Sequence, residues 1–260
     1  MTTRKSGTLP VTLTFLGTRG EIDLRTRAHG RHSALLLSHR GTVLMLDCGA
    51  DWLHRLAAMA PTAILVTHAH PDHAAGLADG APCPVYATDA AWRSMSHYPV
   101  RIRHSITPRT SLRLNGVEVE TFPVVHSLRA PAVGFRIRTG RTCLFYVPDV
   151  LKIPDWRDAL SGIQLYIGDG AALYRSIVRG RGRVRIGHAS VREQLRWCAA
   201  AGVPRAMFTH CGTEIVGGDG RRLNAALRRL AGEYGVEARF AVDGLKICLN
   251  GSSTAIADCI

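Results

Sequence analysis

Four residues that commonly bind metal ions lie within one short stretch, Thr67-His68-Ala69-His70-Pro71-Asp72-His73. An apolar run at 63–66 precedes it and predicts a buried strand, and the residues AAGL at 74–77 follow it and predict the first turn of a helix. Alternate side chains of an extended chain share a face, so the first two histidines point the same way, and the aspartate and third histidine follow on the turn. Three imidazoles and a carboxylate suit Zn²⁺ or another first-row divalent ion. The alternative is a surface cluster of histidines that binds no metal, and such clusters are rare.

Three further residues of the same kind each end a segment that predicts a strand. They are His126 after 117–125, Asp149 after 142–147 and His210 after 206–209. A single histidine in such a place is more often a core or capping residue than a ligand. Strand ends of one layered domain can converge on one edge, however, and this shared position predicts a common site.

The rest of the chain predicts many strands interleaved with fewer helices. Predicted hairpins join 33–38 to 42–47, 111–114 to 117–125 around Asn115-Gly116, and 133–138 to 142–147, and helices are expected at 51–59, 89–95, 190–201 and 219–234. Residues 99–110 are expected to be loop. No repeat or linker divides the sequence, so we expect one α/β domain over residues 1–260, with a core at about 10–250 and a tail at 251–260.

Composition narrows the setting. The 260 residues are 46% hydrophobic, enough for a sizeable core, yet no stretch has the length of a membrane span and no apolar region follows the basic start. We therefore expect a cytoplasmic protein without membrane contact. No CxxC pair occurs, and all cysteines are expected to be reduced and largely buried: Cys48, Cys83, Cys143, Cys198, Cys211, Cys248 and Cys259.

The net charge of +13 comes almost entirely from arginine. Arginine is concentrated in two polar segments, 19–31 and 175–185. An anionic substrate or nucleic acid would explain this excess, and a general compositional bias with solvated loops is the alternative.

Together these residues resemble the metallo-β-lactamase fold superfamily over roughly residues 10–250. The resemblance rests on Asp47 in LDCG, on THAHPDH, and on His126, Asp149 and His210 in that order. It implies a four-layer αβ/βα sandwich with two divalent ions, expected to be Zn²⁺ although manganese or iron would fit, at the edge of two sheets. It further implies that His68, His70 and His126 hold one ion, that Asp72, His73 and His210 hold the second, that Asp149 bridges them, and that Asp47 orients the motif loop.

The chemistry implied is hydrolysis by a hydroxide that bridges two ions. Residues 15–20, FLGTRG, are similar to the FLGTGG opening of the ribonuclease Z and PhnP-type phosphodiesterase branch, and Asp149 in place of a cysteine disfavours the classical zinc β-lactamases. We therefore expect a phosphodiesterase that acts on a nucleotide, cyclic phosphate or short nucleic acid. The expected phosphate-binding residues are Arg19, Arg25, Arg27, Arg31, Arg181 and Arg183.

Some features depart from ribonuclease Z. Gly168 stands where its HEAT motif has histidine, and Asp169 keeps only the acid; no long arm for transfer RNA is found. His188 is a candidate general acid, or else a structural histidine at a helix start, and with Asp72 and Asp149 it completes the expected catalytic set. A thioester or lactone hydrolase of glyoxalase II type and a metal-bearing accessory protein remain alternatives. Relatives in this branch are often dimers, so a homodimer is also expected.

Overall fold

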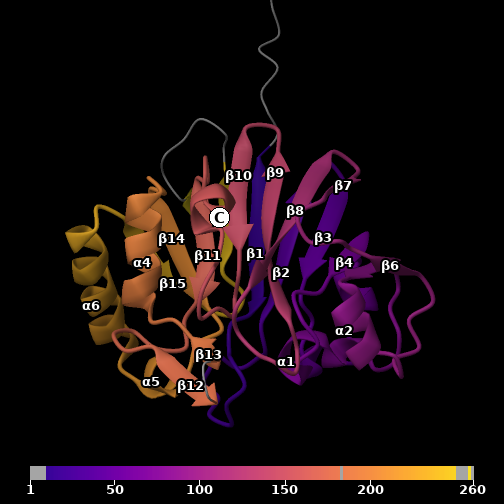
Figure 1. Ribbon diagram of the computed structural model, residues 1–260, viewed down its shortest axis with the longest axis horizontal. Helices are drawn as coiled ribbons and strands as arrows, with labels where there is room; N and C mark the ends of the chain where they lie inside the picture. Colours follow the sequence, from indigo (N-terminus) through magenta and orange to yellow (C-terminus); the bar gives the residue numbers. More distant parts are fainter. Residues whose placement is uncertain (1–9, 182–183, 250–256, 259–260) are drawn as a thin grey trace, which may run out of the picture.

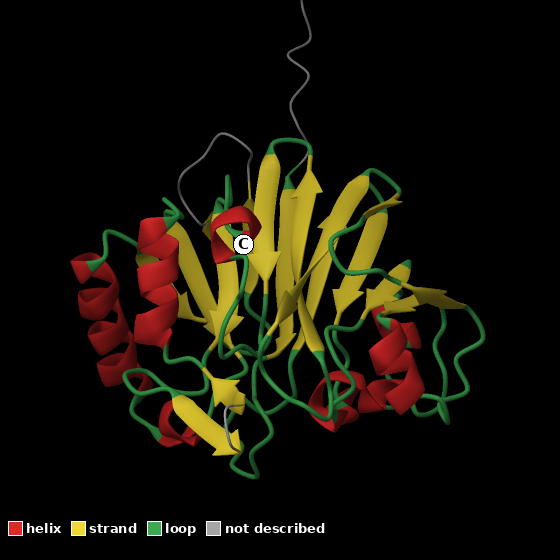
Figure 2. Ribbon diagram, viewed as in Figure 1, coloured by secondary structure: helices red, strands yellow, loops and turns green. Residues whose placement is uncertain are grey.

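A computed structural model describes residues 10–181, 184–249 and 257–258. Two large sheets form the centre, with strand order β17-β16-β1-β2-β3-β4-β5-β6 in one and β15-β14-β11-β10-β9-β8-β7 in the other (Figure 1). A small sheet of β12 and β13 lies at their lower edge. Helices flank the two sheets at both sides of the molecule (Figure 2).

The first sheet contains β1 (Val11–Gly17), β2 (Ala34–His39), β3 (Thr42–Leu46), β4 (Ala63–Leu65), β5 (Val85–Ala87), β6 (Arg103–Ser105), β16 (Lys246–Leu249) and β17 (Ala257–Asp258). The second contains β7 (Ser111–Leu114), β8 (Val117–Val124), β9 (Ala132–Thr139), β10 (Thr142–Tyr146), β11 (Leu165–Asp169), β14 (Arg205–Thr209) and β15 (Glu237–Phe240). The small sheet pairs β12 (Ile177–Arg181) with β13 (Val184–His188). The helices are α1 (Pro71–Ala74), α2 (Asp89–Ser94), α3 (Trp156–Ala159), α4 (Val191–Ala200), α5 (Thr213–Gly217) and α6 (Gly220–Glu233), with 3₁₀ turns η1 (Ala50–Trp52), η2 (Ala57–Met59) and η3 (Ala75–Leu77).

Three apolar clusters account for the layers. The central one joins β1–β3 to β8–β10 through residues such as Leu13, Leu37, Val119 and Phe135, so the two sheets pack face to face. The second lies between the β15-to-β8 sheet and helices α4 and α6, and the third between the β1-to-β5 strands and the helical segments around α1 and α2. The expected four-layer αβ/βα sandwich is confirmed.

Several local expectations were wrong. The helix predicted at 51–59 is broken into η1 and η2, with His54 between them at a φ of 61°, a left-handed conformation that no α-helix accommodates. Residues 103–105, predicted as loop, form β6, which pairs in parallel with β5. In the tail, Ala257–Asp258 pair with β16.

The cysteine prediction needs one correction. Cys48, Cys83, Cys143, Cys198 and Cys211 are free thiols, but Cys248 is disulfide-bonded. Among the described residues, no helix combines the length and the apolar character of a membrane span.

The topology explains why one edge of the molecule carries polar residues. Strands β3 and β4 run parallel, as do β10, β11 and β14, so their carboxyl ends meet at the same edge. The chain leaves these strands into Asp47, the THAHPDH motif, Asp149, Asp169 and His210. This edge, where α1 and β13 lie in Figure 1, holds the candidate site.

Candidate metal centre

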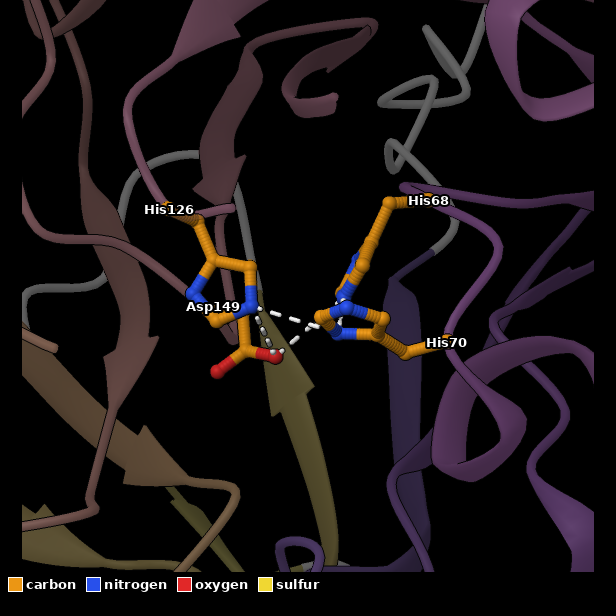
Figure 3. Close-up of side chains that lie close together, drawn as sticks. All are labelled: His68, His70, His126 and Asp149. Atoms are coloured by element: carbon orange, nitrogen blue, oxygen red, sulfur yellow. Dashed lines mark hydrogen bonds and ion pairs between the residues drawn. The ribbon is translucent and has the colours of Figure 1, made fainter. Parts of the chain in front are cut away.

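The first ligand group joins the motif to the other sheet. Nε2 of His68 lies 2.9 Å from Nδ1 of His70, which is 3.3 Å from Nε2 of His126. Oδ2 of Asp149 is 3.3 Å from His68 Nε2 and 3.4 Å from His126 Nε2. Figure 3 shows these four side chains, from opposite sides of the site, pointing toward one another.

A second ligand group adjoins the first. Its members are Asp72, His73, His210 and again Asp149, and their ligand atoms lie within 4.8 Å of one another. Oδ2 of Asp72 is 2.9 Å from His210 Nε2 and 3.2 Å from His73 Nε2. His73 Nε2 is also 3.1 Å from Asp149 Oδ2. The structure thus brings together the seven residues expected as ligands, with Asp149 common to both groups.

The donor set fits divalent cations. His73 Nε2, Asp149 Oδ1 and His210 Nδ1 are buried and have no hydrogen bond of acceptable geometry among the described residues. Buried polar atoms left in this state are costly, and a cation would satisfy all three. Burial holds the pKa of His68 well below its usual value, whereas at His73 and His210 the neighbouring carboxylates outweigh burial and raise the pKa. The cluster is a site for divalent metal ions.

Asp47 supports the motif loop from behind. Its Oδ1 accepts a hydrogen bond from Thr67 N at 2.8 Å, and its Oδ2 accepts from His73 Nδ1 at 2.9 Å and from Tyr146 Oη at 3.2 Å. Likewise Gly187 O accepts from His126 Nδ1 at 3.1 Å. These partners occupy the outer ring nitrogens, so Nε2 of both histidines faces the centre.

His188 lies beside the ligand groups and contacts two carboxylates, those of Asp169 and Asp149. Its Nδ1 lies 2.8 Å from Asp169 Oδ2 and 3.0 Å from Asp149 Oδ1, and its side chain is 22% exposed. Burial lowers the pKa of His188, but Asp169 and then Asp149 outweigh it and raise the pKa to about 11. Nε2 has no protein partner among the described residues, so it is the nitrogen open to a ligand. Asp169, His188, Asp149 and His210 also satisfy the geometric criterion for a metal-binding group.

Gln194 of α4 holds Asp169 and the residue after His188 in place, a role that the sequence did not predict. Its Nε2 donates to Asp169 O at 2.7 Å and to Ala189 O at 3.1 Å, and its Oε1 accepts from Asp169 N at 2.9 Å. The side chain is fully buried. No sequence signal marks Gln194, because its partners lie on β11 and after β13.

The arginines of the two basic segments differ in placement. Arg19 is 2% exposed and donates to Ile22 O and to Asp51 Oδ2, the latter at 2.9 Å, so it holds its own loop and does not face a substrate. Arg25, Arg27 and Arg31 are exposed. Arg183 lies outside the described residues, and Arg181 belongs to β12 without a described side chain.

Sequence relatives agree with this geometry. A family model described as the beta-lactamase superfamily domain matches residues 42–211. The chain is 25% identical over 253 residues to ribonuclease Z of Mycobacterium marinum, covering 80% of this chain and 88% of that protein. Ribonuclease Z of Methanopyrus kandleri is 26% identical over 247 residues, covering 77% and 87%.

Solved structures are similar in fold. The metallo-beta-lactamase fold protein YhfI from Bacillus subtilis superposes with a TM-score of 0.73 at 19% identity, covering 92% of this chain and 99% of that one. A diphosphatase from the PhnP family gives a TM-score of 0.71 at 20% identity, covering 93% and 98%. The resemblance to the ribonuclease Z and PhnP-type branch is therefore confirmed.

Proposed function

The chain belongs to the beta-lactamase superfamily, and on that premise we propose that it is a phosphodiesterase dependent on two divalent metal ions. The observation that carries the proposal is the sharing of Asp149 between two adjoining ligand groups. Sequence similarity to proteins named ribonuclease Z supports the choice of phosphodiester bonds over other substrates.

The seven ligands divide as the two groups suggest: His68, His70 and His126 in one, Asp72, His73 and His210 in the other, and Asp149 in both. When bound, two divalent ions would supply an activated water and neutralise charge on the phosphate oxygens. Asp47 keeps the motif loop and His73 in position for this. An all-nitrogen-and-oxygen donor set with three imidazoles in one group favours zinc, and manganese or iron suits the same atoms.

His188 is placed to serve the leaving group. Asp169 engages Nδ1, so the ring can present a proton on Nε2 at the partly exposed mouth of the site. An alkoxide leaving group needs such a proton, because it is a poor leaving group in its charged form. We assign His188 as the general acid and Asp169 as the residue that positions it.

The substrate of this proposal is a phosphate-bearing small molecule or a short nucleic acid. Arg27 and Arg31 are proposed to bind phosphate, whereas Arg25 is paired with Asp51, and Arg181 and Arg183 remain predictions. We also propose a cytoplasmic location. Five cysteines among the described residues are free thiols, which supports it, whereas the disulfide of Cys248 counts against it. The homodimer remains a prediction.

The test compares three substrates with zinc-loaded protein: bis(p-nitrophenyl) phosphate, a thioester and a lactone. We expect turnover of the phosphodiester and its loss by more than about 100-fold in Asp149→Asn, because even outer partners of metal ligands are worth 10–100-fold. The matched control is Asp155→Asn, an exposed aspartate outside the cluster. Turnover of the thioester or lactone alone would make this a glyoxalase II-type enzyme, and no turnover with metal bound would indicate an accessory protein.

A further inference from the structure

An open pocket of about 520 Å³ lies outside the metal centre, against the loop that connects β1 to β2. We call it the arginine pocket, after Arg25, Arg27, Arg31 and Arg55 in its lining. Asp51 and Asp243 contribute the carboxylates. The connecting loop, coloured indigo, extends beyond the strands at the same lower edge as the metal centre (Figure 1).

Both carboxylates are already engaged by the protein. Oδ1 of Asp51 accepts from Arg25 Nη1 at 2.8 Å, and its Oδ2 accepts from Arg19 Nη2 and from His32 N, both at 2.9 Å. Asp243 Oδ1 accepts from Thr18 Oγ1 at 2.7 Å, and its Oδ2 accepts from Gly30 N at 2.9 Å. The carboxylates therefore fix the loop and are not available to neutralise further arginines.

Three guanidinium groups remain for a ligand. Arg27 and Arg55 are exposed, and within the described ranges neither side chain has an ion-pair or hydrogen-bond partner. Arg31 lies over the ring of Trp52, with 5.5 Å from its Cζ to the ring centroid, and its guanidinium makes no hydrogen bond or ion pair with the described part of the chain. Guanidinium forks match phosphate oxygens in geometry as well as charge, so the pocket favours a phosphate group.

The same loop touches the metal centre at its other end. A Cβ on Gly20 would lie 3.0 Å from Cε1 of His210, so the chain passes close to this histidine here. Gly20 N donates to Cys211 O at 3.1 Å, beside His210. The neighbouring residue, Arg19, is buried and donates a hydrogen bond to Asp51, which lines the arginine pocket. The loop that lines the arginine pocket thus reaches the candidate metal centre through Gly20.

We propose that the arginine pocket binds a second phosphate of the substrate, one that lies along the chain from the phosphodiester being cleaved. The proposal rests on the proposed function and sharpens it. A cyclic monophosphate or a nucleoside monophosphate carries a single phosphate and cannot supply the second one, whereas a short nucleic acid carries several along one chain. The substrate class of this proposal is an oligonucleotide, with Arg27, Arg31 and Arg55 as its backbone contacts.

The test uses the double variant R27A/R55A and a matched control, R228A/R229A, which removes the same charge from exposed positions on α6. Zinc-loaded protein is titrated into a fluorescein-labelled octadeoxynucleotide with phosphorothioate links, and anisotropy is followed at several salt concentrations. R27A/R55A should weaken binding roughly tenfold and lower the slope of log K against log salt by about 1.4, since each single-strand phosphate contact contributes about 0.7. R27K/R55K, which keeps the charge but loses the fork, should fall between the two.

A kinetic arm separates this proposal from the preceding one. In R27A/R55A the fall in kcat/KM for an unmodified octanucleotide should exceed the fall for bis(p-nitrophenyl) phosphate at least tenfold. Equal binding losses in R27A/R55A and R228A/R229A, or no loss in either, would overturn the pocket. A wild-type protein that binds the labelled strand through the pocket but cleaves no phosphodiester would instead refute the phosphodiesterase proposal.

Discussion

At the scale of single residues, His188 concerns protonation of the leaving group, which is a separate requirement from activation of the water. Its Nδ1 contacts Asp169 at 2.8 Å and Asp149 at 3.0 Å, so one carboxylate that positions it is also a shared metal ligand. Proton donation by Nε2 matters only when the leaving group is a strong base. Activation of water depends on the ligands and not on this ring, so the two steps can be distinguished by the choice of leaving group.

We expect His188→Ala to reduce kcat for an oligonucleotide by about 10²–10⁴, the usual contribution of general acid catalysis. The loss on bis(p-nitrophenyl) phosphate should be far smaller, because p-nitrophenolate leaves without protonation. Steady-state kinetics on both substrates measures the ratio, with His97→Ala, an exposed histidine, as the control. Equal losses on the two substrates, together with lost zinc, would identify His188 as a ligand instead, as its place in the third geometric group allows.

A site residue could be predicted where its type and its position along the sequence were enough to identify it, and not where its role depends on tertiary contacts. The ligands from the motif, with His126, Asp149 and His210, follow from residue type and position at strand ends, and the structure brings their atoms together. Arg19 looks like its exposed neighbours in sequence, but burial turns it inward to Asp51. Asp169 was identified only as the acid of the HEAT-like position. Its contact with His188 could not be predicted, because Asp169 ends β11 and His188 ends β13.

At the scale of elements, α4 connects His188, the proposed general acid, to the second sheet. Gln194 bridges the end of β11 to the segment after β13 by bonding both backbone groups of Asp169 and the carbonyl of Ala189. It also accepts from Tyr166 Oη at 2.9 Å. A fully bonded, buried amide has little freedom, so it fixes where Asp169 and His188 stand relative to each other.

Gln194→Met should therefore imitate a loss of His188. We expect kcat for an oligonucleotide to fall well beyond that for bis(p-nitrophenyl) phosphate, while KM and zinc content change little. The free energy of unfolding should also fall by about 1–3 kcal/mol, because Asp169 N and Tyr166 Oη would be left unsatisfied. Kinetics on both substrates and urea unfolding give these quantities, with Gln164→Met as the control, since Gln164 Oε1 makes one bond to Cys143 N at 3.1 Å away from the site. A uniform loss on both substrates would mean that Gln194 supports the whole centre and not the acid alone.

Element boundaries were predictable where local rules decide them. The Asn115-Gly116 turn occurs as expected between β7 and β8, with φ values of 45° and 88° that suit this pair. The helix expected at 51–59 is interrupted at His54, and just before it Gly49 lies so close to the motif loop that a Cβ there would be 2.1 Å from Asp72 O. Tertiary contact overrides local propensity in that segment.

At the scale of the whole molecule, the metal centre joins the two halves of the sandwich. Its ligands come from the first sheet through the motif and from the second through His126, Asp149 and His210. Among the described residues, the buried atoms His73 Nε2 and His210 Nδ1 make no hydrogen bond of acceptable geometry. Bound ions should therefore stabilise the fold as a whole, by linkage between binding and unfolding.

We expect zinc to raise Tm by the amount that two bound ions contribute together. An ion at about 100 times its Kd stabilises by about 2.7 kcal/mol, so two contribute about 5 kcal/mol. At about 2–4 °C per kcal/mol for a chain of this size, the shift is about 10–20 °C. Thermal unfolding of EDTA-treated protein titrated with zinc gives the shift and the stoichiometry, and Asp149→Asn should lose most of it because this carboxylate belongs to both groups. Saturation at one equivalent would contradict the two-ion centre, and the shared position of Asp149 would then have to serve a single ion and the Asp169–His188 pair.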